Sequence, residues 1–302
     1  MSEYLIETKR LCKKYNDEYA LKDASITIEK GKIYGLVGEN GAGKTTLIKL
    51  LAGLIKPSSG NIIFQGDDSD AGLRKHRKQF GFIVEAPYLN PEMSAFENLN
   101  LQRIQRGIKD KNRIEKVLNI VGLENSKKKV ENYSLGMKQR LGIAIALLEK
   151  IDVLVLDEPT NGLDPAGIIE FRKLIVELNE KLGITIIISS HILSELECIA
   201  TDLIFVSKSN IVKSISMDEV KKCCERKYIL NVSDCEKVKY ELENNGIKVE
   251  VNDEQKLIIY GEISAEEIAY SVFKKGCYTY EFREEQQTLE QYYLSLVGGN
   301  NE

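Results

Sequence analysis

The sequence lacks any apolar run long enough to cross a membrane. Its densest apolar stretch, Gly183 to Ile188, falls far short of the roughly 18 consecutive apolar residues that a transmembrane helix needs. The first residues, MSEYLIETKR, lack the apolar centre of a secretory signal. We therefore expect that any work at a membrane depends on a second chain.

Excess charge of either sign is also nearly absent. The 302 residues include 42 Lys and Arg against 46 Asp and Glu, a formal net charge of −4. A dedicated nucleic-acid binder would usually carry a net basic domain or stripe, so no nucleic-acid partner is expected. The cysteines are few and scattered, which favours reduced thiols in a cytosolic protein over a disulfide framework. They are Cys12, Cys198, Cys223, Cys224, Cys235 and Cys277.

Proline is missing from the C-terminal part of the chain, beyond residue 165. All five prolines lie in the first 165 residues, whereas four of the six cysteines lie beyond Ser209. This asymmetry, in a chain long enough for two cores, predicts two domains. We expect a large domain over residues 1–216, a linker over 217–226 and a smaller domain over 227–302.

Strand patterns give each domain a fold class. In the large domain, the apolar strands Val153 to Asp157 and Thr185 to Ser190 alternate with helical patterns. Such continuous apolar strands are typical of an α/β fold with a parallel sheet covered on both faces. The segment from KYILNV to CYTYEF predicts an α+β domain with the order βαββαβ, that of a ferredoxin-like unit, followed by an amphipathic tail.

A phosphate-binding loop stands early in the chain. Residues 38–45, GENGAGKT, match the P-loop pattern, and the strand and helix that this pattern requires flank them. Glycines let bare N–H groups approach phosphate oxygens, and the helix N-terminus favours the same anion. Lys44 is expected to bridge the β- and γ-phosphates, and Thr45 to ligate Mg²⁺. The expected nucleotide contacts are Asn40, Gly41, Ala42, Gly43, Lys44, Thr45 and Thr46.

Two carboxylates end a later strand, VLVLDEP. Asp157 is expected to hold the Mg²⁺ shell, and Glu158 to polarise the attacking water as general base. His191 ends the strand TIIISS, 34 residues after Asp157, where its imidazole could hydrogen-bond the γ-phosphate. With Lys44, these residues form the predicted catalytic set. The only other histidine, His76, lies in the basic run RKHRK and is expected to be solvated.

Between these motifs stand YSLGMKQRLGIAIALL at residues 133–148 and NGLD at residues 161–164. They resemble the signature and D-loop of ATP-binding cassette (ABC) ATPases, and roughly residues 1–215 resemble their nucleotide-binding domain, with its antiparallel β subdomain and helical subdomain. The resemblance implies a homodimer of two copies packed head to tail, with ATP held between the P-loop of one and the signature of the other. By that resemblance Ser134 and Gly136 contact ATP across the dimer, and Asp164 carries signals across it.

The resemblance also assigns an adenine contact. Tyr15, in KKYNDEYALKDAS, corresponds to the aromatic residue that stacks on the base, with Tyr19 as the alternative. Either tyrosine could instead be a packing residue.

Two positions depart from the family pattern. The usual LSGGQ reads YSLGM, so Leu135 replaces a glycine, and its backbone amide serves only if φ stays negative. Glu85 stands where most members carry a glutamine that reaches Mg²⁺ and the attacking water, and we expect it to join Thr45 and Asp157 at the metal. Glu85, with the following APYLNPEMSAFENL, resembles the ATPases of bacitracin-type and lantibiotic-immunity exporters. Tolerated drift at this position is the alternative.

The resemblance implies an ATP-hydrolysing subunit that drives a separate membrane permease, exporting antimicrobial peptides or antibiotics. Such a subunit would be cytoplasmic, held at the inner face of the membrane by the permease. Apolar residues over 86–100 (Pro87, Tyr88, Leu89 and Phe96) are expected to form the docking groove, unless they pack into the domain's own helical lobe. A non-transport ABC ATPase in assembly or repair, and a weakly hydrolysing regulatory module, remain as alternatives. The C-terminal domain is expected to support a homodimer or regulation.

Overall fold

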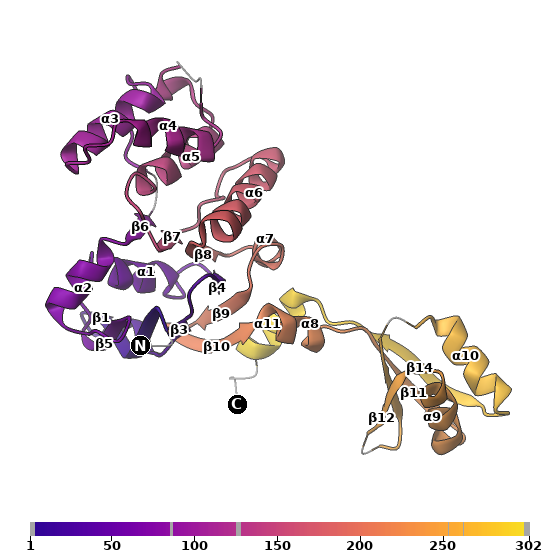
Figure 1. The fold of residues 1–302 in the computed structure, drawn as a ribbon. Coiled ribbons are helices and arrows are strands. Elements are labelled where there is room, and N and C mark those ends of the chain that lie inside the picture. Colours follow the sequence, from indigo (N-terminus) through magenta and orange to yellow (C-terminus); the bar gives the residue numbers. More distant parts are fainter. Residues whose placement is uncertain (1–3, 85–86, 125–127, 253, 262, 299–302) are drawn as a thin grey trace. The chain divides into compact units, whose positions relative to one another are not determined.

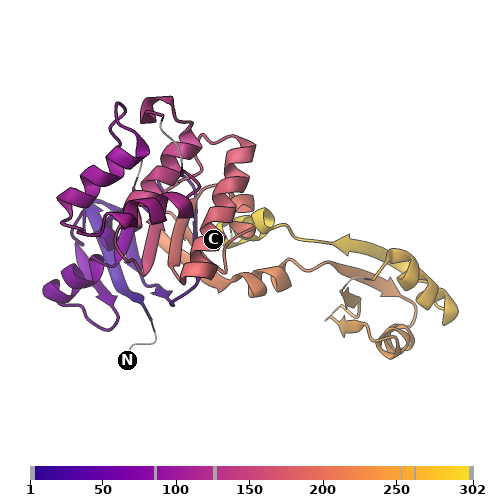
Figure 2. The same ribbon diagram turned by 45° about the horizontal axis from the view of Figure 1, so that its top comes forward.

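Two compact units make up the chain, Met1–Met217 and Asp218–Glu302. The computed structural model describes residues 4–84, 87–124, 128–252, 254–261 and 263–298 (Figures 1 and 2). Within these ranges no helix is both long enough and apolar enough to cross a membrane. The expected residue Glu85 lies outside the described residues.

The first unit combines one large sheet with helices. Its strands are β1 (Ile6–Tyr15), β2 (Glu18–Ala24), β3 (Thr27–Ile28), β4 (Ile33–Val37), β5 (Ser59–Phe64), β6 (Phe80–Ile83), β7 (Val153–Leu156), β8 (Thr185–Ser190), β9 (Asp202–Ser207) and β10 (Asn210–Ser216). Its helices are α1 (Lys44–Ala52), α2 (Asp70–Arg77), α3 (Ala95–Gln105), α4 (Asn112–Ile120), the 3₁₀ turn η1 (Val130–Asn132), α5 (Leu135–Ala146), α6 (Pro165–Leu182) and α7 (Leu193–Glu197). Helix α8 (Met217–Cys223) begins at Met217, the last residue of the first unit.

A parallel core lies at the centre of this sheet. The strands run in the order β6-β7-β8-β4-β9, and every neighbouring pair is parallel. Every residue of β4, β7 and β8 is buried, as the continuous apolar patterns predict. Because the carboxyl ends of parallel strands share one edge, the loops after β4, β7 and β8 can meet there.

An antiparallel region, formed by β1, β2, β3 and β5, continues the sheet. The sequence patterns left β2 unassigned. The run SITIE, residues 25–29, predicts a strand, and in the structure this strand is limited to Thr27–Ile28. Strand β2 folds back on β1 through a tight turn in which Asn16 adopts a left-handed φ of 51°. Pairing with β1, rather than a strong alternation of its own, therefore makes EYALKDA a strand.

A helical lobe, comprising α3, α4 and α5, lies beyond the β6 edge of the sheet (Figures 1 and 2). Helix α3 begins with a capping box in which Ser94 and Glu97 satisfy each other's backbone N–H groups. Helix α5 packs against β6 and so links the lobe to the parallel core.

The second unit has its own sheet and core. Its elements are α8 after its first residue, β11 (Lys227–Val232), α9 (Cys235–Asn244), β12 (Lys248–Val251), β13 (Leu257–Tyr260), α10 (Ala265–Lys274), β14 (Thr279–Glu285) and α11 (Leu289–Gly298). The strand order is β12-β13-β11-β14, with every neighbouring pair antiparallel. Helices α9 and α10 contribute Val238, Leu242 and Ile268 to the core. The six elements from β11 to β14 follow one another in the βαββαβ order.

Candidate functional site

The loop between β4 and α1 is shaped by glycines. A Cβ at Gly38 would lie 2.3 Å from the carbonyl oxygen of Val206 in β9, so only glycine fits against that strand. Gly41 and Gly43 have φ of 81° and 114°, a region that other residues rarely adopt. Within the described residues no side chain caps α1, and its N-cap is Gly43. The first-turn N–H groups of α1 are thus directed at the loop, which suits a phosphate.

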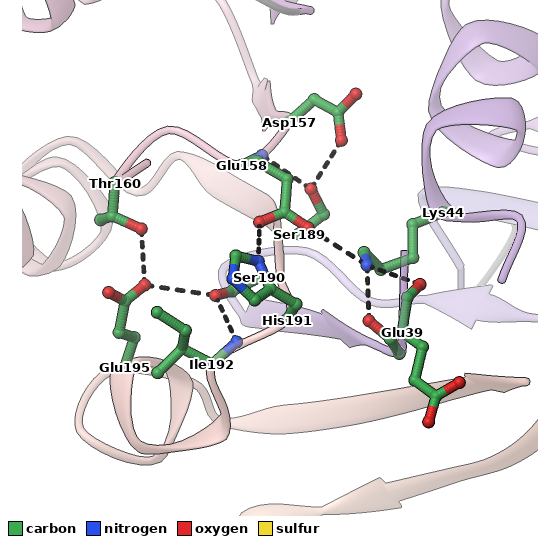
Figure 3. A network of polar contacts seen from close by, with 11 residues as sticks. Glu39, Lys44, Asp157, Glu158, Thr160, Ser189, Ser190, His191, Ile192 and Glu195 are labelled. Carbon is green, nitrogen blue, oxygen red and sulfur yellow. Dashed lines mark hydrogen bonds and ion pairs between the residues drawn. The ribbon is translucent and has the colours of Figure 1, made fainter. Parts of the chain in front are cut away.

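Lys44, the first residue of α1, lies buried beneath this loop with 5% of its surface exposed. Its Nζ donates to the carbonyl oxygens of Gly38 and Glu39, at 2.5 and 3.2 Å. The same Nζ forms an ion pair with Oε1 of Glu158 at 3.1 Å. The lysine that the sequence assigns to phosphate therefore contacts the predicted general base (Figure 3).

Glu158 lies between Lys44 and His191. Its other carboxylate oxygen, Oε2, is 2.7 Å from Nδ1 of His191. The two residues follow the neighbouring strands β7 and β8, so the parallel sheet brings them together across 33 residues of sequence. Glu158 also has a left-handed φ of 47°, an unusual backbone conformation for a residue with a side chain. The predicted catalytic set thus forms one chain of contacts.

Ser189 holds the strand end that carries the two carboxylates. Its hydroxyl donates to Oδ1 of Asp157 at 2.7 Å and accepts from the backbone N–H of Glu158 at 2.8 Å. The backbone N–H of Asp157 donates to the carbonyl of Ile83 in β6 at 2.9 Å. Asp157 is buried at the edge of the sheet, and its orientation is determined by neighbours on both sides.

Oxygen ligands are available here for a hard cation. Thr45 and Thr46 follow Lys44 in the first turn of α1, and both are half-buried. A threonine hydroxyl and one carboxylate suit Mg²⁺, which is usually held by one or two carboxylates together with substrate phosphates. The part of the chain that the structure describes holds no group of three or more His, Cys, Asp or Glu suited to a metal ion.

The signature segment starts a helix. Ser134 is the N-cap of α5 and accepts from the N–H of Met137 at 3.2 Å. Leu135 is the first helical residue, so its φ is negative, as the sequence argument requires. A Cβ at Gly136 would meet only ordinary contacts, the nearest at 3.7 Å. The N-terminus of α5 thus retains the backbone geometry of an anion site despite Leu135.

Asp164 is the N-cap of α6, where its Oδ1 accepts from the N–H of Gly167 at 3.1 Å. The preceding Gly162 has a φ of 79°, and Leu135 lies 3.1 Å from the position of a Cβ on it. The signature and the D-loop are therefore in contact within one chain. Within the described residues, Ser134, Gly136 and Asp164 take no part in the Lys44–Glu158–His191 chain of contacts.

Comparison with known proteins gives the family. A family model described as "ABC transporter" matches residues 21–161. The bacitracin transport ATP-binding protein BcrA of Bacillus licheniformis is 39% identical over 98% of this chain and 98% of its own length. The chain belongs to the ABC transporter family. Within that family, the chain is an ATP-binding subunit and an ATPase. The resemblance drawn from the sequence motifs is confirmed.

Other matches agree with this assignment. The lantibiotic transport ATP-binding protein SrtF of Streptococcus pyogenes is 43% identical over 69% of this chain and 89% of its own. The structure of cbiO1 from Clostridium perfringens, part of the ABC transporter complex cbiONQ, matches 81% of this chain and 98% of its own with a TM-score of 0.67 and 30% identity. The dimeric, ADP- and Pi-bound cassette MJ0796 matches 70% of this chain and 98% of its own with a TM-score of 0.61 and 25% identity. The cassette fold of this ABC ATPase is therefore shown.

The two adenine candidates occupy one hairpin of the ABC ATPase. Tyr15 ends β1 with half of its surface exposed, and the Lys13 ammonium lies 5.0 Å from its ring centroid. Tyr19, on β2, is 45% exposed. The carbonyl of Ala20, the next residue, would lie 2.7 Å from a Cβ on Gly43, so β2 passes close to the phosphate loop. Both rings are accessible, and the choice of Tyr15 stays a prediction.

Several polar residues of the site were missed by the sequence patterns. They are Ser189, Thr160, Ser190 and Glu195, which the structure places around Asp157, Glu158 and His191. The only sequence signal was proximity, because each of them lies within four residues of a recognised motif residue. Their hydrogen bonds depend on the pairing of β7 with β8, which local patterns do not specify.

Proposed function

We propose that this ABC ATPase powers a separate membrane permease that exports antimicrobial peptides or antibiotics. The observation that carries the proposal is the full-length match to BcrA, whose name states bacitracin transport. That match extends over 300 residues and so includes the C-terminal unit, whereas the match to SrtF covers 209. The permease would hold the ATPase at the inner face of the membrane.

A cavity in the first unit supports permease docking. It has a volume of about 310 Å³ and lies between β6, α3 and α5, with Tyr88, Gln102 and Arg106 among its lining residues. Tyr88 is 94% exposed, so its ring is available to a partner. Pro87 packs on α5, since a Cβ at Gly142 would lie 2.9 Å from it. Pro87 thus packs inward, and Tyr88 faces outward, where a permease could contact it.

The arrangement of Lys44, Glu158 and His191 supports a mechanism for hydrolysis. ATP phosphates compete for the Lys44 ammonium, and Glu158 is then released to accept a proton from the attacking water. His191, already 2.7 Å from Glu158, holds that carboxylate and lies ready to position the γ-phosphate. Thr45 and Asp157 would hold Mg²⁺, which neutralises phosphate charge, and Glu85 is proposed to join them.

A head-to-tail homodimer completes this proposed site. The helix N-terminus at Ser134 and Gly136 would contact the ATP of a second copy, because the positive end of a helix dipole favours an anion. Asp164, next to the signature through Gly162 and Leu135, would transmit the state of that contact. The dimeric structure of the similar cassette MJ0796 supports a dimer of this chain.

Transport is tested by expressing the ATPase with the permease that its gene neighbourhood supplies, in a sensitive host. The wild-type pair should lower sensitivity to bacitracin or a lantibiotic, and Glu158→Gln should abolish the protection. Tyr88→Ala should reduce both co-purification with the permease and protection while ATP turnover of the isolated subunit persists. Unchanged sensitivity with an active, membrane-bound pair, or purification with non-membrane partners alone, would overturn the proposal.

A further inference from the structure

A buried carboxylate lies behind the catalytic residues. Glu195, on the short helix α7, has 5% of its surface exposed. One of its oxygens, Oε2, accepts two hydrogen bonds, from the Thr160 hydroxyl at 2.5 Å and from the Ser190 hydroxyl at 3.2 Å. Both donors are buried as well. Figure 3 shows the Glu195 carboxylate joined to these two hydroxyls.

The two hydroxyls belong to the segments that carry the predicted catalytic groups. Thr160 lies two residues after Glu158, on the segment that follows β7. Ser190 ends β8 and directly precedes His191, and its hydroxyl also accepts from the N–H of Ile192 at 3.0 Å. The Glu195 carboxylate therefore joins the segment of Glu158 to the segment of His191, beyond the last residues that pair β7 with β8.

The need for a stable core does not explain this group. Burying a carboxylate removes its hydration, and most buried carboxylates in proteins are paired with a cationic side chain. Among the described residues, the Glu195 carboxylate accepts from two hydroxyls, and an apolar side chain would fill the space without that desolvation cost. What the carboxylate adds is a single acceptor that holds two neighbouring segments at a set spacing.

We infer that Glu195 is a positioning residue for ATP hydrolysis: by holding Thr160 and Ser190, it sets the position of Glu158 relative to His191. Glu195 would thus act through these two residues and not by contacting the nucleotide itself. The inference rests on the roles proposed above for Glu158 and His191, but not on the exported substrate. A misplacement of reacting groups by about 1 Å can lower a rate about a hundredfold, so loosening this link should affect turnover more than nucleotide binding.

Steady-state ATP turnover of the full chain tests the inference, together with binding of a non-hydrolysable ATP analogue. Glu195→Ala should lower kcat by about tenfold to a hundredfold and leave KM and analogue affinity within about twofold. Glu195→Gln should recover most of the lost rate, because one oxygen takes both bonds and glutamine keeps an oxygen. Glu197→Ala, an exposed residue of the same helix, is the matched control and should turn over as the wild type does.

Variants of the donors separate positioning from folding. Thr160→Val removes one hydroxyl, and Thr160→Ser keeps it. Thr160→Val should lower kcat, and Thr160→Ser should not. In the double variant Thr160→Val, Glu195→Ala, the fold-loss in kcat should be smaller than the product of the two single fold-losses. If Glu195→Ala fails to fold, the Thr160 pair and Ser190→Ala decide alone.

Three results would overturn the inference. The first is an unchanged kcat in Glu195→Ala or, if Glu195→Ala does not fold, in Thr160→Val and Ser190→Ala. The second is a parallel loss of kcat and analogue affinity. The third is a Glu195→Gln variant as slow as Glu195→Ala. Absence of turnover in the wild type would instead contradict the ATPase mechanism from which the inference starts, so the two failures are distinguishable.

Discussion

Replacing Glu158 by glutamine separates its contact with Lys44 from its role with water. Glutamine has the same shape and keeps an oxygen for the Lys44 Nζ, 3.1 Å away, but it carries no charge and accepts no proton. General-base catalysis contributes about 10²- to 10⁴-fold to a rate, and kcat of Glu158→Gln should fall by that factor.

The same change should tighten ATP binding. At 3.1 Å and an effective dielectric constant of about 20, the attraction between Lys44 and Glu158 amounts to about 5 kcal/mol. Hydration of the released carboxylate offsets most of this, because 18% of the Glu158 side chain is already exposed. A remainder of about 1 to 2 kcal/mol would strengthen nucleotide binding about 5- to 30-fold, since ATP no longer has to displace a charged partner from Lys44.

Phosphate release measures the rate, and calorimetric titration with a non-hydrolysable analogue measures the affinity. Glu177→Gln is the matched control, because Glu177 forms an exposed ion pair with Lys181 on α6 and should leave both quantities unchanged. Wild-type turnover in Glu158→Gln would refute the general-base assignment. Weaker analogue binding would refute the reasoning about Lys44. Equal, negligible turnover in the wild type and the variant would favour a regulatory module over an ATPase.

The chain contains no tryptophan, so Tyr15→Trp introduces a single tryptophan, which can be excited selectively over the tyrosines. Its emission should change on adding ATP, whereas a change only in Tyr19→Trp would move the adenine contact to β2. Gly43→Ala should abolish ATP binding in a fluorescence or calorimetric titration, because φ is 114° and the new Cβ would lie 2.7 Å from a backbone oxygen. Hydrogen bonds from Lys274 and Lys275 hold the pKa of Glu241 below its ordinary value of 4.5. A carboxyl pKa that is lowered in the folded state contributes stability above pH 4.5, and this contribution is lost as the pH falls further. Thermal unfolding followed by circular dichroism should therefore show that the stability of Glu241→Gln declines less steeply with acid than that of the wild type. An identical decline would contradict this assignment.

Local patterns predicted much of the fold because the forces behind them act between near neighbours in the chain. The P-loop could be recognised from eight consecutive residues, since its turn and the following helix N-terminus form the phosphate cradle together. The buried strands β7 and β8 were evident from unbroken apolar runs. Strand β2 was missed because its polar residues form a strand only when paired with β1.

Residue types and motif spacing in the sequence thus determined the family, the nucleotide and the predicted catalytic set of Lys44, Glu158 and His191. Only the tertiary structure decided which groups those side chains contact. The ion pair of Lys44 with Glu158 spans 114 positions, and the link from Thr160 to Glu195 spans 35. Contacts of this kind exist because parallel strands deliver distant loops to one edge of the sheet, where burial leaves each polar group only the neighbours that the fold provides.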